Sequence, residues 1–184
     1  PGKTEAWYVI AARPGATILA GLASRRHARR LDALVRQGEL PQALAALHPR
    51  AGDAWLCPAG AVHALGPGVV LLEIQQNSDT TFRLYDWDRK DAGGRARPLH
   101  VAEAVRAVNG RALRLVAARP RAVRGLPFEA ERLVACEKFV LDRWRLRSAA
   151  LRPPRKGFEI LHVLEGSGAL DAEGAPPLAL RRGR

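Results

Sequence analysis

Short apolar stretches separated by glycine and proline dominate the first 90 residues of the chain. Residues 5–22 (EAWYVIAARPGATILAGL) predict two strands around a turn at residues 13–15. Side chains alternate along a strand with a period of two, so Glu5, Trp7 and Val9 share one face of the first strand. Four further stretches predict strands by the same criteria: AWLCP, AVHAL, VVLLEIQQ and TTFRLYDW, between residues 52 and 87.

Helical periodicity interrupts this β pattern twice. Residues 27–48 predict two short helices, because each half carries a leucine-rich apolar stripe and Gly38 and Pro41 separate the halves. Residues 100–108 (HVAEAVRAV) predict a third helix, since their valines recur at helical spacing. The chain therefore combines many short strands with a small helical insert.

The second half of the chain is less regular. Residues 111–130 are rich in Arg, Pro and Gly and predict a connector. Two later stretches, RLVACEKFVLDRWRLR at residues 132–147 and FEILHVLEG at residues 158–166, predict strands again. Many short strands with Gly/Pro turns favour a β-sandwich or barrel. We therefore expect one β domain over residues 1–110, with its helical insert at about 27–48, and a partial second β domain over 131–184.

Composition narrows the class of protein. The chain has 184 residues and a net charge of +12, from 30 Lys plus Arg against 18 Asp plus Glu. Its arginines are scattered without the interleaved aromatics that stack on bases, which argues against nucleic acid as a partner. We find no apolar run of 18 residues and no secretory pattern, which favours a cytoplasmic protein with no membrane partner. The two cysteines predict reduced thiols.

One stretch, GDAWLCPAGAVHALG at residues 52–66, points to chemistry. Gly52 and Asp53 suit a turn that enters a strand, and Pro58 and Gly60 suit a second sharp turn that a helix would not tolerate. His63 is then delivered to a defined face of a sheet. A single histidine in apolar sequence is commonly a structural residue, so the spacing G-x5-P-x-G-x2-H is what favours a ligand role.

This spacing resembles the second conserved motif of the cupins, double-stranded β-helix (jelly-roll) barrels that bind a divalent metal. The flanking blocks GKTEAWYVI (residues 2–10) and CPAGAVHALGPGVVLLEIQQNSDTTFRLYDWDR (residues 57–89) are more specific. Together they resemble type I phosphomannose isomerase, a zinc-dependent cupin enzyme. The resemblance implies a mainly β cupin fold with a short helical insert, followed by the start of a second cupin-like domain.

The resemblance also implies a function and roles for individual residues. The function is interconversion of mannose 6-phosphate and fructose 6-phosphate through an enediolate. Glu5 and His63 match zinc ligands of the family, Arg83 matches its catalytic arginine, and Lys3 matches a lysine of the sugar pocket. The family's other ligands come from a Q-x-H segment upstream of the Lys-Thr-Glu block, and no such segment is present. With no Met at position 1, we expect a chain truncated at both ends, with the remaining zinc ligands upstream of residue 1.

The same residues suit this chemistry on physical grounds. Aldose–ketose isomerisation moves a proton between adjacent carbons, and negative charge builds up on oxygen. A divalent metal held by Glu5 and His63, which we expect on neighbouring strands, and the always charged guanidinium of Arg83 would stabilise that charge. Glu73 lies between Leu72 and Ile74, and an acid among apolar residues suits proton transfer.

Each role has a plainer alternative. Glu73 would be a structural acid paired with an arginine, Arg83 a partner in a surface ion pair, Lys3 a solvated residue at the end of a strand, and Glu5 an exposed acid. For the whole chain, the alternatives are a sugar-phosphate-binding cupin module without turnover, which includes an incomplete, inactive fragment, and a polyanion-binding surface. Oligomeric state is left open.

Overall fold

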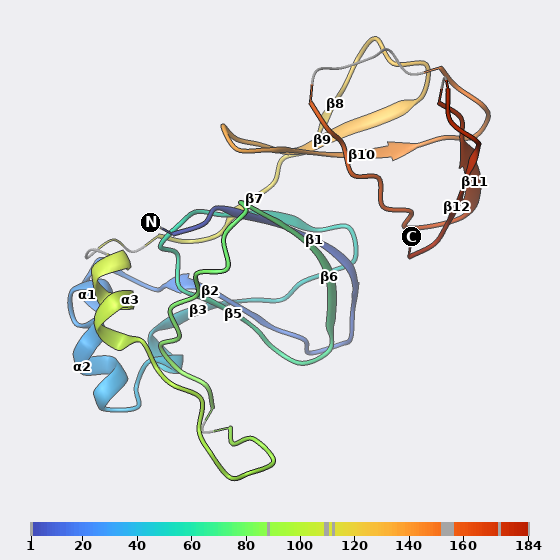
Figure 1. Ribbon diagram of the computed structural model, residues 1–184. Helices are drawn as coiled ribbons and strands as arrows, with labels where there is room; N and C mark the ends of the chain where they lie inside the picture. Colours follow the sequence, from blue (N-terminus) through green and yellow to red (C-terminus); the bar gives the residue numbers. More distant parts are fainter. Residues whose placement is uncertain are drawn as a thin grey trace. The chain divides into compact units, whose positions relative to one another are not determined.

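The computed structural model describes residues 2–87, 89–108, 111, 113–151, 157–172 and 174–183 (Figure 1). The chain divides into two compact units, Pro1–Ser148 and Ala149–Arg184. The strands of the first unit are β1 (Glu5–Ala12), β2 (Ile18–Leu22), β3 (Leu44–Leu47), β4 (Ala54–Cys57), β5 (His63–Leu65), β6 (Val69–Gln75), β7 (Val116–Ala117), β8 (Arg121–Ala122), β9 (Glu129–Ala135) and β10 (Val140–Arg145). Its helices are α1 (Arg25–Arg29), α2 (Leu31–Arg36), the 3₁₀ turn η1 (Pro41–Ala43) and α3 (Val101–Val108).

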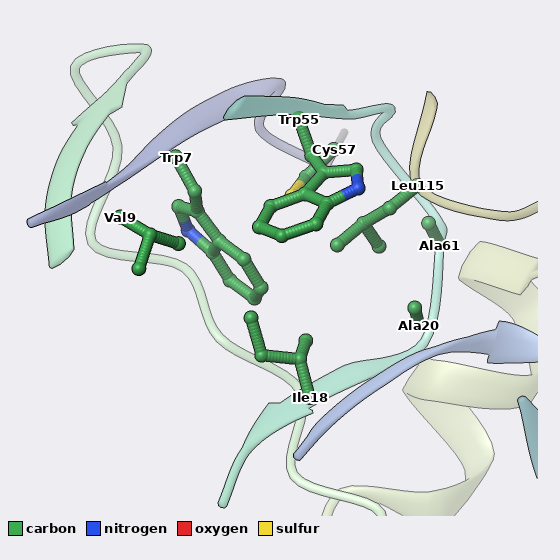
Figure 2. Close-up of a cluster of buried hydrophobic side chains, with 8 residues drawn as sticks. All are labelled: Trp7, Val9, Ile18, Ala20, Trp55, Cys57, Ala61 and Leu115. Atoms are coloured by element: carbon green, nitrogen blue, oxygen red, sulfur yellow. The ribbon is translucent and has the colours of Figure 1, made fainter. Parts of the chain in front are cut away.

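Two antiparallel sheets enclose the main core of this unit. One has the strand order β6-β1-β4-β7 and the other the order β3-β2-β5. Between them lies a cluster of buried side chains (Figure 2): Trp7, Val9, Ile18, Ala20, Trp55, Cys57, Ala61 and Leu115. Trp7 and Val9 of β1 both belong to this cluster, as their shared face predicts, although the intervening Ala6 and Tyr8 are buried as well. The mainly β class predicted from the sequence is confirmed as well.

A second buried cluster joins the helices to the sheets. It consists of Leu22 at the end of β2, Leu84, and helix and turn residues: Ala28, Leu31, Leu40, Ala104 and Val108. Ser24 is the N-cap of α1, since its hydroxyl accepts a hydrogen bond from the backbone N–H of His27 at 3.2 Å. The predicted helix at 100–108 is confirmed as α3. Within the described ranges, no helix is long and apolar enough to span a membrane.

Strands β8, β9 and β10 form a separate antiparallel sheet in the order β10-β9-β8. The side chain of Arg143 on β10 links this sheet to β1, because its Nη1 lies 3.4 Å from the hydroxyl oxygen of Tyr8. Arg143 also donates to Glu131 on β9, and these two partners raise the pKa of its guanidinium. The strands predicted over residues 132–147 are confirmed as the β9–β10 hairpin.

The second unit contains one antiparallel pair, β11 (Ser167–Leu170) and β12 (Leu178–Arg181). Several of its apolar side chains are highly exposed, with Phe158 at 89% and Ile160 at 84%. The predicted strand at 158–166 is wrong, since the described residues there have no strand pairing. Alternating apolar residues form a strand only when a partner edge is present. The domain boundaries predicted at 110 and 130 stay predictions.

The helical insert also differs from its prediction. The first half forms α1 and α2, but the second half forms the turn η1 and the strand β3. Residues 44–47 (LAAL) are all apolar and therefore satisfy a helical and a strand period equally well. The edge of β2 decides between them, because Ile18 and Leu22 pair with Leu47 and Leu44. Tertiary pairing here overrides local preference.

The strand predicted at 80–87 is likewise absent from the structure. Ion pairs and a short backbone pairing hold this segment instead. Arg83 N donates to the ring Nδ1 of His100 at 3.2 Å, and His100 N donates to the carbonyl oxygen of Arg83 at 2.8 Å. The carboxylate of Asp86 accepts hydrogen bonds from Arg89 and Arg97, which lie in the loop that follows.

The close approach of β2 to residues 113–114 generates the first prediction. Gly21 has φ +92°, and a Cβ at this position would clash with the carbonyl oxygen of Leu113 and lie 2.7 Å from Cα of Arg114. We expect Gly21→Ala to cost about 1–2 kcal/mol for the left-handed backbone and a further ~1–3 kcal/mol for the forced displacement. Urea unfolding measures the loss.

Gly15→Ala is the matched control, because Gly15 has φ +78° and no atom within 4 Å of the added Cβ. It should show the backbone cost alone. Equal losses of stability in the two variants would contradict the proposed close approach.

Candidate active site

Cross-strand pairing assembles the site on the inner face of the first sheet. Glu5 pairs with Cys57 on β4 and with Gln75 on β6, so these three residues form one row across the sheet. Two residues further along β1, Trp7 pairs with Glu73 on β6 and with Trp55 on β4, and these three residues form a second row on the same face. Acidic and amide groups thus lie beside an apolar core.

His63 reaches the same space from the second sheet. Asp53 closes the turn before β4, since its carboxylate accepts from the backbone N–H of Arg50 at 2.8 Å. The second turn is closed by Ala61 N, which donates to the carbonyl of Pro58 at 3.0 Å, with Gly60 at φ +85°. β5 then pairs His63 with Ala20 of β2. The two predicted turns are therefore confirmed.

The carboxylate of Glu5 and the imidazole of His63 meet between the sheets. Their atoms Oε2 and Nε2 lie 3.3 Å apart, and the Glu5 side chain is 4% exposed. The expectation that they stand on neighbouring strands is wrong, because β1 and β5 belong to different sheets. The sheets face each other across the core, which brings the two side chains together without strand pairing.

Hydrogen bonding defines the state of the His63 ring. Its Nδ1 lies 2.9 Å from the carbonyl oxygen of Ala61. A carbonyl only accepts, so Nδ1 carries the proton and, in the neutral ring, Nε2 presents a lone pair. Oε2 of Glu5 is buried and, among the described residues, has no hydrogen-bond donor. With the ring neutral, Oε2 and Nε2 are two acceptor atoms that face each other, and a cation bound to both atoms would satisfy them.

Lys3 lies beside this pair. Its Nζ is 3.4 Å from Oε1 of Glu5 and donates a 2.6 Å hydrogen bond to the side-chain carbonyl of Gln75. Lys3 lies two residues before β1 begins, and its contact with Glu5 confirms that both side chains lie on the same side. The Lys3 side chain is 17% exposed, so it is partly shielded rather than the solvated lysine of the alternative interpretation.

Glu73 is held by tryptophan. Its Oε2 accepts a 2.9 Å hydrogen bond from the indole Nε1–H of Trp7, its cross-strand partner. The residue is exposed, so it is not the enclosed acid among apolar neighbours that its sequence context predicted. Within the described part of the chain, this hydrogen bond comes from an indole and not from the arginine of the alternative interpretation.

Arg83 makes its contacts elsewhere. Its Nη1 donates to the carbonyl oxygen of Pro98 at 3.3 Å, and its Nε lies 3.9 Å from Oδ1 of Asp86. In the described residues these contacts do not include Glu5, His63 or Lys3. A cavity of about 420 Å³ separates Gly2, next to Lys3, from Phe82, next to Arg83. The cavity is also lined by Ala59, Gly60, Glu103, Arg106 and Ala107.

Asp86 is the centre of the loop that carries Arg83. It is 6% exposed and accepts from Nε of Arg97 at 2.7 Å and from Nη2 of Arg89 at 2.8 Å. These hydrogen bonds, chiefly the one from Arg97, hold the pKa of Asp86 below its ordinary value. Arg89 lies three residues after Asp86 and Arg97 eleven residues after it, so the two arginines reach this carboxylate from different parts of the loop.

Sequence reasoning placed Trp7 on the same face as Glu5 but did not give Trp7, Gln75 or Cys57 a place beside the site. The signal was the alternation Glu5-x-Trp7 on β1 and Glu73-x-Gln75 on β6, which places each pair on one face. Cys57 is 1% exposed, and burial, followed by the charges of Glu5 and Glu73, raises the pKa of its thiol. Both cysteines are free thiols, as expected.

Comparison with known proteins identifies relatives that share most of this chain. The chain matches no protein-family profile. It is 34% identical to mannose-6-phosphate isomerase ManA of Bacillus subtilis over 92% of the chain and 53% of that protein. It is 34% identical to mannose-6-phosphate isomerase of Streptococcus mutans over 99% of the chain and 56% of that protein. The chain thus spans about half the length of the curated relatives it matches.

The fold shows the same relationship. The crystal structure of mannose 6-phosphate isomerase from Bacillus subtilis superposes with a TM-score of 0.82, at 31% identity, over 99% of this chain and 57% of that one. This likeness confirms the predicted class, a mainly β cupin fold. Within that class, the chain is homologous to bacterial mannose-6-phosphate isomerases, and the resemblance drawn from its sequence blocks is confirmed.

The burial of Cys57 predicts its reactivity. Alkylation proceeds through the thiolate, and both the enclosure and the raised pKa of Cys57 oppose it. We expect iodoacetamide to modify Cys57 in the native protein at least about tenfold more slowly than the half-buried Cys136. Mass spectrometry of peptides at timed intervals measures both rates, and urea should abolish the difference. Equal native rates would contradict the described packing of β4.

The arginines around Asp86 predict an acid-dependent stability. A carboxyl whose pKa is lowered on folding stabilises the protein above its ordinary value, about 3.9. That stabilisation is lost as the pH falls through the lower, folded-state pKa. We expect Asp86→Asn to lower the free energy of unfolding at pH 7, with a difference from wild type that shrinks below pH about 4.

Urea titrations at several pH values measure this difference. Asp32→Asn is the control, since Asp32 is an exposed carboxylate paired with Arg36, and its replacement should change stability little. A stability loss for Asp86→Asn that is the same at every pH would show that ionisation of Asp86 is not the cause.

Proposed function

We propose that this chain carries part of the active site of a zinc-dependent isomerase that interconverts mannose 6-phosphate and fructose 6-phosphate. The observation that carries the proposal is the pair of facing acceptor atoms on Glu5 and His63, 3.3 Å apart between the two sheets. The names of the homologous proteins support the choice of reaction and substrate. A cytoplasmic location is part of the same proposal.

The donor set fits zinc. Glu5 and His63 offer one carboxylate oxygen and one imidazole nitrogen, and the Ala61 carbonyl holds the ring in the tautomer that leaves Nε2 available. In the described residues no group of three or more His, Cys, Asp and Glu side chains gathers as a metal site. Glu5 and His63 are therefore proposed as two ligands of a larger shell. When bound, the metal would act as a Lewis acid toward the sugar oxygens.

The chain's own side chains account for the remaining work. Lys3, fixed by Gln75 and Glu5, would bind an oxygen of the substrate through its ammonium group. Glu73, on the same face of the sheet, would remove and return the proton that moves between adjacent carbons through an enediolate. Arg83, whose chain neighbour Phe82 lines the cavity that Gly2 also lines, would stabilise negative charge on an oxygen of the substrate.

A coupled assay that reports fructose 6-phosphate tests this proposal on the complete, zinc-loaded gene product that contains this chain, in which the kinetic and zinc-affinity comparisons below are also made. We expect His63→Ala to lower metal affinity or activity by at least about 100-fold, because it removes a ligand. Arg83→Ala should lower kcat by about 10²–10³, the range for loss of one group that stabilises developing charge.

Matched substitutions control for the change of residue type. His48 is exposed and Arg36 lies on the surface of α2, so His48→Ala and Arg36→Ala should leave the activity within about twofold of wild type. If the His63→Ala and Arg83→Ala variants both keep wild-type activity, the proposed roles of these residues are wrong. Binding of metal and sugar phosphate without turnover would instead support the alternative of a sugar-phosphate-binding cupin module.

A further inference from the structure

Trp7 contacts both kinds of functional group in the candidate site. Its indole Nε1–H donates the 2.9 Å hydrogen bond to Oε2 of Glu73. Its ring lies against the imidazole of His63, with centroids 5.0 Å apart and planes at 89°. The residue is 1% exposed and packs in the main core beside Ile18 (Figure 2). A buried aromatic ring with two χ angles is a rigid reference point for its neighbours.

Glu73 depends on such a reference point. It lies on β6, which is an edge strand of its sheet, and its side chain is exposed. An exposed carboxylate on an edge strand samples several rotamers unless a hydrogen bond selects one. The indole group only donates, so it holds the carboxylate by one oxygen and leaves the other oxygen available.

The orientation of the His63 imidazole depends on the indole ring of Trp7 rather than on the indole N–H group. The Ala61 carbonyl fixes Nδ1, but one hydrogen bond still allows the imidazole to tilt about that contact. The edge-to-face contact with Trp7 removes this freedom and directs Nε2 toward Glu5. The two contacts of Trp7 are thus chemically separable: one uses the N–H group and the other uses the aromatic surface.

We propose that Trp7 is a positioning residue that orients the proton-transfer carboxylate of Glu73 through its N–H and the metal-binding imidazole of His63 through its ring. This inference rests on the proposed function for the catalytic consequences, but not for the geometry. It assigns one buried side chain to the alignment of two groups that come from different sheets.

Two substitutions separate the two contacts. Trp7→Phe keeps an aromatic ring against His63 and removes the N–H. We expect it to lower kcat by about 10- to 100-fold, with KM and zinc affinity within about threefold of wild type. Trp7→Leu removes the ring as well, and we expect it to weaken zinc binding by about 10-fold or more in a chelator competition.

Trp55→Phe is the matched control. Trp55 is the cross-strand partner of Trp7 and is also buried in the main core, at 7% exposed. Its replacement should leave kcat and zinc affinity within about threefold of wild type. If it lowers kcat as much as Trp7→Phe does, then general loosening of the core explains both results and the proposal fails.

A double-mutant cycle tests whether Trp7 acts through Glu73. We expect Trp7→Phe to lower kcat by less than about twofold in a Glu73→Gln background, because the group it orients is already disabled. Independent, additive losses of kcat would contradict the proposed action through Glu73.

A spectroscopic measurement keeps the inference testable if the isomerase assignment fails. The indole N–H resonance of Trp7 is identified by its absence in Trp7→Phe. We expect Glu73→Gln to shift this resonance and to leave that of Trp55 in place. If wild type lacks isomerase activity but the resonance shifts, the proposed function fails and the geometry holds. An unchanged Trp7 resonance would overturn the positioning role whatever the activity.

Discussion

The facing of two antiparallel sheets across one core is the constraint on which the candidate site depends. Glu5 is on the first sheet and His63 on the second, and they lie 3.3 Å apart only because Trp7, Ile18 and their neighbours set the spacing of the sheets. A buried carboxylate and an imidazole are costly to keep in such a place unless a positive charge accompanies them. The ammonium group of Lys3 supplies such a charge beside Oε1 of Glu5, and a metal ion bound by Oε2 and Nε2 would supply a second one.

The architecture divides the work between the two kinds of element. Strand pairing places Gln75, Glu5 and Cys57 in one row, and this row determines which groups Lys3 can reach. The loop after β6 carries Arg83 and is organised by ion pairs around Asp86 rather than by a sheet. The proposed site thus joins a rigid sheet face to a loop that charge interactions hold in shape.

The names of the homologous proteins support the choice of reaction for this arrangement. The chain spans only about half of their length. We propose Glu5 and His63 as part of a zinc shell that is built from more than one segment of sequence.

The sequence by itself determined the elements with an unambiguous period and the residues with a distinctive spacing. Alternation predicted the inward face of β1, and the glycines and proline of residues 52–60 predicted the turns before His63. It could not decide between helix and strand at residues 44–47, where every residue is apolar and the edge of β2 made the choice. Nor could it show that Glu5 and His63 belong to opposing sheets, or that Trp7 touches Glu73 and His63 together. Those relations depend on the distances between segments far apart in the chain, which only three-dimensional packing establishes.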